Sequence, residues 1–377
     1  TDRFATGWGV SPALVRDTEL EANSKPGVNN ETWGASLNMG YDTGAVKLTS
    51  ITAYDWLKRL QFADWDSSAS IEADTFFGSR VKVFAQEVRL ASSAPSPLTW
   101  VVGGYYAKQT LNERYFSDFI DIYGTYARVN YAQTVESMSG FGQLDYALSP
   151  KLTVTAGLRY EWEKRSLQGF GSAFGGAQAL PPTSIDTRMT PWTSKVGLEY
   201  RPTKGLMLYA SASKGAKSGG FTTYNTGNSS GIQPFAHETL RAYEVGLKAN
   251  PSRALQFNLA GFYYDYRNQQ VLSAVFAPAT RSVVGKFVNA PKSRITGFDA
   301  DAILRPVPGL TLTAFVGFKD GRYLDFQDLD APATRAALAP VYRNKSHTAI
   351  PFAKWSGGGT AAYDIAAGDF LVSPDRK

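Results

Sequence analysis

Hydrophobic residues recur at every second position through long stretches of this chain. Residues 255–263 read LQFNLAGFY, and residues 310–318 repeat the pattern as LTLTAFVGF. A period of two residues is typical of a β-strand, in which successive side chains point to opposite faces, whereas helical segments have a period of 3.6 residues. The pattern therefore predicts a sheet with one apolar face and one face that tolerates water.

The connections between these segments alternate between short and long. Short turns with proline or glycine are predicted at residues 42–44, 94–97, 149–150, 202–205, 250–253 and 305–309. The intervening connections, at 167–189, 218–234 and 321–350, are long and polar. Brief turns at one end and extended loops at the other are typical of an outer-membrane barrel, whose long loops face the medium. We expect any ligand to bind at the long-loop end.

The turns are spaced by about fifty residues, a period that kelch-type propellers share. A propeller blade needs four short strands and three tight turns. Each repeat here has one tight turn and two long strands. We therefore predict an all-β, transmembrane, antiparallel, up-and-down β-barrel with about thirteen strands: one before Asp42 and six pairs between successive turns. A soluble propeller or sandwich that acts as a binding module is the alternative.

Membrane-spanning helices are not predicted. The longest uncharged apolar run, near LTWVVGGYYA, has about ten residues, and a spanning helix needs roughly 20. Aromatic residues make up 13% of the chain and recur close to the short turns and again further along each strand. Ten residues of tilted strand rise roughly 26 Å, which matches the apolar band between two aromatic belts.

The strand count predicts that the chain is an internal piece of a larger barrel. The predicted number of strands is odd, with the start of a further strand expected at residues 370–372, whereas bacterial single-chain barrels have even numbers of strands. Thr1 follows neither an initiator methionine nor a signal peptide. We therefore expect residues 1–377 to form a partial barrel domain.

Several strings, taken as a set, resemble the barrel of TonB-dependent outer-membrane receptors. They are YASASKGAKSGGF, FNLAGFYYDYRNQQV and VNAPKSRITGFDADAILRPVPGLTL. The earlier strings LTSITAYDW and FAQEVRLASS resemble strands from the first half of the same barrel. The resemblance runs in collinear order over residues 48–323.

The resemblance implies a barrel of roughly 22 strands around a plug domain. Such receptors import scarce nutrients, such as ferric siderophores, cobalamin or oligosaccharides, with energy relayed by TonB. It also implies a location in the bacterial outer membrane, in contact with lipid and lipopolysaccharide. The sequence departs from the family in lacking the plug and the terminal strands, so TonB is expected to act through the missing N-terminal region. A passive porin-like channel is the alternative within transport.

Few residues are suited to catalysis or to holding a metal or cofactor. The chain has two histidines, His237 and His347, and no cysteine. His237 and Glu238 are adjacent on a predicted strand and so face opposite sides, which is poor geometry for a catalytic pair. The acidic segment 320–330 lacks the ligand spacing of a calcium loop. We predict no enzyme activity, no resident metal and no cofactor, and the net charge of +6 without a basic run argues against nucleic-acid binding.

Four residues are predicted as ligand contacts. Lys214 and Lys217 lie at the top of a predicted strand, and Phe221 and Tyr224 follow in the adjoining loop. Cations beside aromatic rings suit an anionic chelate. The alternative is that Lys214 simply lines a wet lumen. A second aromatic segment, residues 112–126, is expected to be a loop that caps the binding mouth or lies on lipopolysaccharide.

Overall fold

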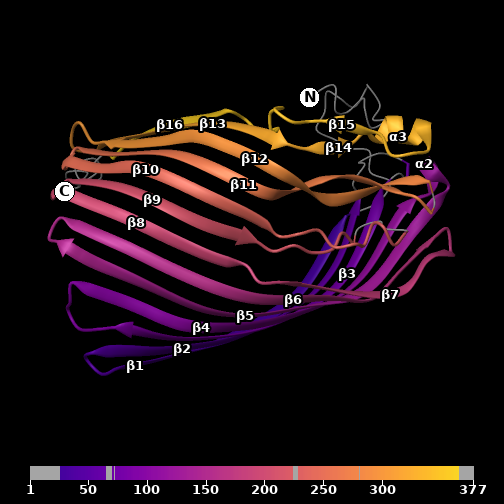
Figure 1. Ribbon diagram of the computed structural model, residues 1–377, viewed down its shortest axis with the longest axis horizontal. Coiled ribbons are helices and arrows are strands. Elements are labelled where there is room, and N and C mark those ends of the chain that lie inside the picture. The colour runs from indigo at the N-terminus through magenta and orange to yellow at the C-terminus, as the bar shows by residue number, and fades with distance from the viewer. Residues whose placement is uncertain (1–25, 65–69, 72, 224–227, 280, 365–377) are drawn as a thin grey trace, which may run out of the picture.

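The computed structural model describes residues 26–64, 70–71, 73–223, 228–279 and 281–364. Within them, one antiparallel sheet runs through thirteen strands in chain order, and one further strand, β7, pairs only with β6. Figure 1 shows the strands side by side, curving into the wall of a barrel. The all-β, up-and-down fold and the count of thirteen strands are confirmed.

The sheet is built from long strands. They are β1 (Gly27–Asp42), β2 (Val46–Asp64), β3 (Asp74–Ser92), β4 (Leu98–Phe119), β5 (Thr125–Ser149), β6 (Leu152–Phe174), β7 (Ala177–Met189), β8 (Trp192–Thr203), β9 (Leu206–Lys217), β10 (Glu238–Ser252), β11 (Leu255–Ala277), β12 (Ser282–Leu304), β13 (Leu310–Asp325) and β16 (Trp355–Tyr363). Two short helices, α2 (Ile120–Tyr123) and α3 (Ala331–Ala337), and a small sheet of β14 (Gln327–Leu329) and β15 (Tyr342–Asn344) lie at the end away from the tight turns (Figure 1). No helix in the described part of the chain has the length and hydrophobicity to cross a bilayer.

All six predicted tight turns join neighbouring strands. In the first, Gly44 has a φ of +86°, and its N–H donates to Asp42 Oδ1 at 2.8 Å. In the last, Gly309 has a φ of +83°, and a Cβ there would lie 2.7 Å from the backbone oxygen of Asp364. Glycine adopts this backbone conformation without strain. These turns fix the pairing of successive strands.

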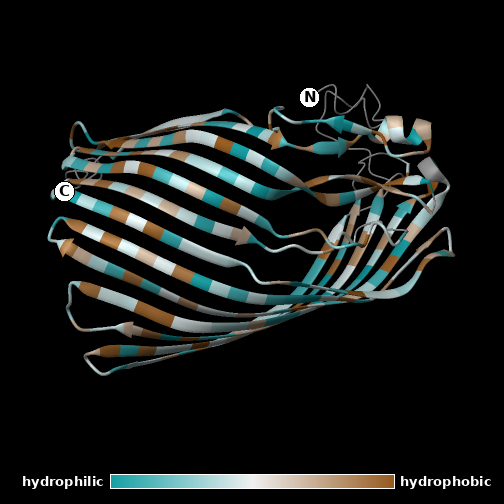
Figure 2. Cartoon of the chain, in the orientation of Figure 1, coloured by the Kyte–Doolittle hydropathy of each residue, from teal (hydrophilic) through white to brown (hydrophobic). Residues whose placement is uncertain are grey.

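The two faces of the sheet differ in polarity, as the banding in Figure 2 shows. On β10, Tyr243 and Val245 are 49% and 61% exposed, while Glu244 points to the other face and accepts a hydrogen bond from Tyr209 Oη at 2.7 Å. Exposed aromatic residues form the two predicted belts, near the tight turns (Tyr41, Tyr146, Tyr200, Tyr363) and further along (Tyr160, Trp192, Tyr263, Trp355). An exposed apolar face between two aromatic belts is the lipid-contacting surface of a membrane barrel. We call it the outer face and the polar face the inner wall.

The strands continue well beyond the upper belt, which corrects two loop predictions. Residues 167–189, predicted to be a long loop, form the end of β6 and all of β7, which turn at Gly175 and Gly176. Residues 112–126, predicted to be an aromatic loop, are strand apart from α2 and Gly124. β5 has 25 residues, about twice what a strand needs to cross the bilayer. The surplus raises these hairpins above the membrane.

The sheet is open among the described residues. Its terminal strands, β1 and β16, do not pair with each other, and every residue in both is exposed. The predicted stub at residues 370–372 lies outside the described residues. The strands described here therefore form part of a barrel wall.

The fold predicts a specific behaviour for the complete protein. In detergent, its circular dichroism should be dominated by β-structure, because the described helices contain only four and seven residues. Boiled and unboiled samples should migrate differently on a denaturing gel, since a closed barrel resists the detergent until it is heated. A helix-rich spectrum would contradict the barrel.

Candidate ligand site on the inner wall

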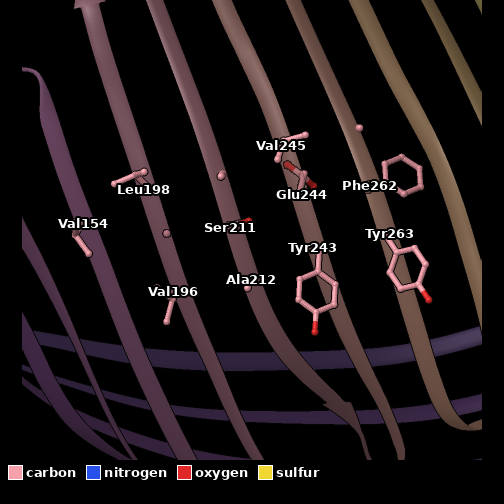
Figure 3. Close-up of a pocket in the computed structure, with 13 residues that line it drawn as sticks. Val154, Val196, Leu198, Ser211, Ala212, Tyr243, Glu244, Val245, Phe262 and Tyr263 are labelled. Carbon is pink, nitrogen blue, oxygen red and sulfur yellow. The ribbon is translucent and has the colours of Figure 1, made fainter.

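An open apolar hollow of about 660 Å³ lies on the outer face. Figure 3 shows its lining residues Val196, Tyr243 and Tyr263, which come from β8, β10 and β11. Each is at least 40% exposed, and the hollow is predominantly apolar. Because this surface belongs to the lipid-facing band, it is suited to acyl chains and not to a polar cargo. The candidate ligand site is on the other face.

Above the upper belt, the inner wall carries a buried acid–base network on β2, β3 and β4. Ser79 Oγ donates to both carboxylate oxygens of Glu113, at 2.8 and 3.0 Å. Arg59 Nε donates to Ser79 Oγ at 3.0 Å, its Nη2 lies 3.7 Å from Glu113 Oε2, and its guanidinium stacks over the Phe77 ring. The three strands meet in register here, so side chains far apart in sequence form one polar cluster.

Burial sets the protonation of this network. Glu113 is 8% exposed, and burial raises the pKa of its carboxyl group, against the opposing effects of the Ser79 hydrogen bond and the Arg59 charge. Burial likewise raises the pKa of the Tyr131 hydroxyl, so this group remains a neutral donor and acceptor. The wall therefore presents the guanidinium of Arg59, the phenol of Tyr131 and the carboxyl group of Glu113. Because its pKa is raised, this carboxyl group keeps its proton to a higher pH than an exposed glutamate does.

The β9–β10 connection folds against the same wall. Gly220 and Phe235 pair through backbone hydrogen bonds at 3.2 and 2.9 Å and close the base of the connection. Ser218 Oγ then donates to Glu163 Oε2 on β6 at 3.0 Å. Thr223 Oγ1 donates to Tyr131 Oη on β5 at 3.0 Å. The connection is thus fixed to side chains of two strands of the inner wall.

Apolar packing reinforces this attachment. Ile232, from the connection, is fully buried in a cluster with residues of β4 to β7, and Phe221 packs against the same cluster. The other members are Tyr115, Val129, Leu167, Phe170 and Leu180. Burying an isoleucine side chain stabilises by about 2 kcal/mol relative to exposure. The connection is therefore a packed part of the barrel mouth.

The other side of the connection contacts the β11–β12 hairpin. The N–H of Ala236 donates to Asn289 Oδ1 at 2.8 Å, and the N–H of Phe287 donates to Thr222 Oγ1 at 3.1 Å. Lys286 Nζ donates to the carbonyl of Ser230 at 3.3 Å, and burial lowers the pKa of this amine. The β9–β10 connection therefore joins the inner wall at β5 and β6 to the β11–β12 hairpin.

Lower on the inner wall, two smaller hollows of about 380 and 280 Å³ adjoin each other at Lys195. The first contains Glu87 and Arg159, and the guanidinium of Arg159 lies over the rings of Tyr105 and Phe141. The second contains the Tyr209–Glu244 pair. Charged groups beside aromatic rings are suited to contacting a polar ligand or another protein segment inside the barrel.

The structure separates the four predicted ligand residues. Lys214 lies on the outer face, with its Nζ 3.4 Å from the centre of the Trp192 ring, and so does not line the lumen. Lys217 ends β9 and is exposed, and Phe221 packs in the apolar cluster of the mouth. Tyr224 lies outside the described residues. Their contact with a ligand stays a prediction.

Sequence reasoning missed the network of Arg59, Ser79 and Glu113. Parity gave no clear signal, because Ser79 lies between Gly78 and Arg80, and Glu113 lies between Asn112 and Arg114. The described residues contain no group of three or more His, Asp or Glu side chains that could hold a metal ion.

The buried Glu113 gives a testable pH dependence. Because its folded-state pKa is raised, its stabilising contribution is complete at low pH and is lost as the pH rises from about 4.3, the usual glutamate value, through the raised value. For the complete protein, the temperature of the heat-induced gel shift should therefore fall less steeply with pH in Glu113→Gln than in the unaltered protein. Glu31→Gln, at an exposed ion pair with Lys58, is the control and should leave the slope unchanged. Identical slopes for all three proteins would contradict a raised pKa at Glu113.

The fold, the apolar outer face and the polar inner wall together define a transmembrane β-barrel protein. The sequence matches the family model described as TonB dependent receptor-like, beta-barrel, over residues 1–374. The chain belongs to this family, whose members are outer-membrane transport receptors. The resemblance seen in the sequence is confirmed.

Individual relatives agree with the family assignment. The pesticin receptor of Yersinia pestis is 25% identical over 226 residues, which cover 59% of this chain and 32% of that protein. The ferric yersiniabactin uptake receptor FyuA from Yersinia pestis superposes with a TM-score of 0.72 at 16% identity, covering 90% of this chain and 48% of that one. The siderophore receptor PiuA from Acinetobacter baumannii gives 0.69 at 14% identity, covering 89% and 52%. These structural likenesses show the fold, and the chain spans about a third of the length of the curated relatives it matches.

Proposed function

We propose that this chain is the barrel portion of an outer-membrane receptor that takes up a scarce nutrient with energy supplied through TonB. The observation that carries the proposal is the inner wall: a buried Arg59–Ser79–Glu113 network, together with a β9–β10 connection that is attached to β5 and to the β11–β12 hairpin. Such a wall offers hydrogen-bond donors, a carboxyl group and aromatic rings to a polar cargo. Residues 1–377 would form the barrel domain, and a plug that contacts TonB would come from the remainder of the protein.

We infer that the cargo is a small molecule or metal chelate, with a ferric siderophore as the leading class. The names of FyuA and PiuA support this class, as does the absence of a metal-ligand cluster among the described residues. Cobalamin or an oligosaccharide would suit the same wall. Lys217 and Phe221, at the start of the β9–β10 connection, are the sequence-predicted residues best placed to meet a ligand at the mouth.

Uptake in cells tests this proposal. A strain that lacks the complete gene should lose accumulation of the ferric chelate that the receptor recognises, and the intact gene should restore it. Deleting tonB in the restored strain should abolish accumulation again, a loss of about a hundredfold or more if uptake against a gradient depends on that energy. The measurement is cell-associated radioactive iron across a panel of ferric siderophores under iron limitation.

The alternative of a passive porin-like channel predicts a different result. Accumulation would then survive the loss of TonB, and the purified protein would conduct ions steadily in a planar bilayer. A gene deletion without effect on any iron chelate, cobalamin or oligosaccharide would contradict nutrient import altogether.

A further inference from the structure

The apolar hollow on the outer face is a furrow that follows β9. Its floor consists of Ala210 and Ala212, two small outward residues of that strand. Larger side chains lie directly opposite these alanines on β8 and β10 and form its walls: Val196, Leu198, Tyr243 and Val245. Figure 3 shows Ala212 between Val196 and Tyr243. Because this surface, which we call the outer furrow, lies in the lipid-facing band, a hydrocarbon chain suits it.

The upper end of the outer furrow is cationic. Lys214 is the next outward residue of β9 above the floor, and its Nζ lies 3.4 Å from the centre of the Trp192 ring. It lies directly opposite Arg241 on β10. Asp265, which faces Arg241 from β11, is already paired with Arg267 at 3.3 Å. The outer furrow therefore suits a ligand that carries an anionic group above a hydrocarbon tail.

Above the outer furrow, the sheet has a break. β9 ends at Lys217, and β10 begins at Glu238. β11 continues beyond Arg267 to Ala277 and pairs there with β12, while β7 pairs only with β6. Figure 1 shows β9 ending short of β7 and of the β11–β12 hairpin. At this level the two flanks are joined through the β9–β10 connection, which bonds to β6 and to β12, and not by strand pairing among the described residues.

The base of this connection brings the upper end of the outer furrow close to the inner wall. Ser218, the residue after β9, donates to Glu163 Oε2 at 3.0 Å, and Arg165 Nε donates to Glu163 Oε1 at 2.6 Å. A Cβ at Gly220 would lie 3.4 Å from Arg165 Nη1, so the backbone of the connection lies against this guanidinium. Lys214 on the outer face and Arg165 on the inner wall thus lie on the two sides of one short segment, and they offer an anionic group successive contacts.

The other flank of the break is apolar. The ring of Phe235, in the connection, lies 5.5 Å from that of Phe287 on β12. Leu272 lies directly opposite Phe287 on β11, and these two side chains are 72% and 39% exposed. Exposed apolar side chains above the lipid band mark a surface that contacts a ligand or a partner. This flank suits a hydrocarbon tail that leaves the membrane.

We propose that the outer furrow receives an amphiphilic cargo from the outer leaflet: a metal chelate with an anionic head and a fatty acyl tail. The tail lies over Ala210 and Ala212, and the head contacts Lys214 and Arg241. The head reaches Arg165 on the inner wall when the base of the β9–β10 connection is displaced. The proposal rests on the proposed function and names the class of cargo. It gives Lys214 the ligand contact expected from the sequence, but with a ligand that approaches from the membrane.

Accumulation of paired ferric chelates by cells that carry the complete protein tests the proposal. The pairs are ferric hydroxamates, catecholates and citrates, each prepared with and without a dodecanoyl tail on the same iron-binding head. The acylated member of the recognised pair should accumulate about tenfold faster at equal concentration, because the tail concentrates the chelate in the membrane where the outer furrow lies.

Filling the outer furrow should remove this advantage. The variant A210F/A212F should lower accumulation of the acylated member about tenfold, the effect of losing roughly ten atom–atom contacts, and should leave the tail-less member unchanged. The control A300F/A302F adds the same rings to outward residues of β12 that do not line the furrow, and should leave both members unchanged.

Removing the cations tests the contact with the head. K214Q/R241Q should lower accumulation of the acylated member about tenfold, since each cation beside an anionic group contributes about one half of that effect or more. The control K58Q/R80Q removes another pair of outward cations that lie directly opposite each other, on β2 and β3, and should have no effect.

Each outcome decides the proposal. Equal losses in a variant and its control would reduce the effect to the general lipid-facing surface or to net charge, and no loss in A210F/A212F would show that ordinary lipid fills the outer furrow; each result overturns the proposal. The heat-induced gel shift verifies folding, and A212F alone, compared with A300F, replaces the double variant if that one fails to fold. Accumulation of tail-less chelates only would overturn the amphiphilic cargo and leave the proposed function intact. Accumulation of no chelate by the unaltered protein would contradict iron-chelate uptake itself.

Discussion

A cysteine placed at Ala336 should react with a membrane-impermeant maleimide added to intact cells, whereas one placed at Ser252 should react only after the outer membrane is permeabilised. Ala336 lies in α3 and Ser252 ends β10 at a tight turn, and both are exposed. Figure 1 shows α3 and this turn at opposite ends of the barrel. In outer-membrane barrels the tight turns face the periplasm and the long connections face the medium.

The contrast between the two sites should be nearly complete. The chain contains no cysteine, so each variant of the full receptor carries a single reactive thiol if the remainder also lacks one. Labelling of Ser252→Cys in intact cells with Ala336→Cys silent would show that the barrel is inverted. Equal labelling of both in intact cells would mean that the outer membrane does not separate them. Purified, denatured samples of both variants should label equally and provide the control.

The membrane-spanning part of the fold was predictable because lipid imposes a strict pattern. Between the belts, most outward residues are apolar and the turns at one end are short. The alternation in residues 255–263 and the glycine at position 309 therefore predicted a strand and a tight turn. Above the membrane these constraints end. The sequence EKRSLQGFGSAF in β6 shows no regular alternation, and its glycines are typical of a loop.

The β6–β7 hairpin shows why such an extension escapes prediction. Pro181 and Pro182 lie inside β7, where two prolines usually argue against a strand. They are tolerated because β7 pairs only with β6, and no ladder bond is formed at these two residues. Only the three-dimensional arrangement reveals that the second edge of this strand is free of a partner among the described strands.

Lys214 illustrates the difference between position along a strand and side of a strand. Its place near the end of β9 predicted contact with a ligand, but it shares parity with Leu208, Ala210 and Ala212 of the outer face. Strict counting from these apolar residues would have placed it on the outer face. In contrast, the pairing of Arg59 with Glu113 depends on the register of three strands, which a single sequence does not specify.

The 377-residue chain produced alone should not yield a monodisperse, conducting barrel. β1 and β16 leave one edge each without a partner, over 16 and 9 residues. Each backbone group left unpaired in hydrocarbon costs several kcal/mol, which exceeds what the outer face gains from lipid at those strands. The expected products in detergent are heterogeneous oligomers joined at these edges. Light scattering after size exclusion would measure them, with the full receptor as the monodisperse control.

Direct pairing of β1 with β16 is the way in which this prediction would be wrong. The thirteen strands alternate in direction, so the first and the last run the same way, and closing the sheet would require one parallel pair among antiparallel ones. The two strands also differ in length, which would leave part of β1 unpaired after closure. A monomer of the isolated chain with a heat-induced gel shift and steady single-channel conductance would show that such a parallel seam forms. Supplying the remainder of the protein on a second polypeptide should instead restore a barrel in which every strand has two antiparallel neighbours.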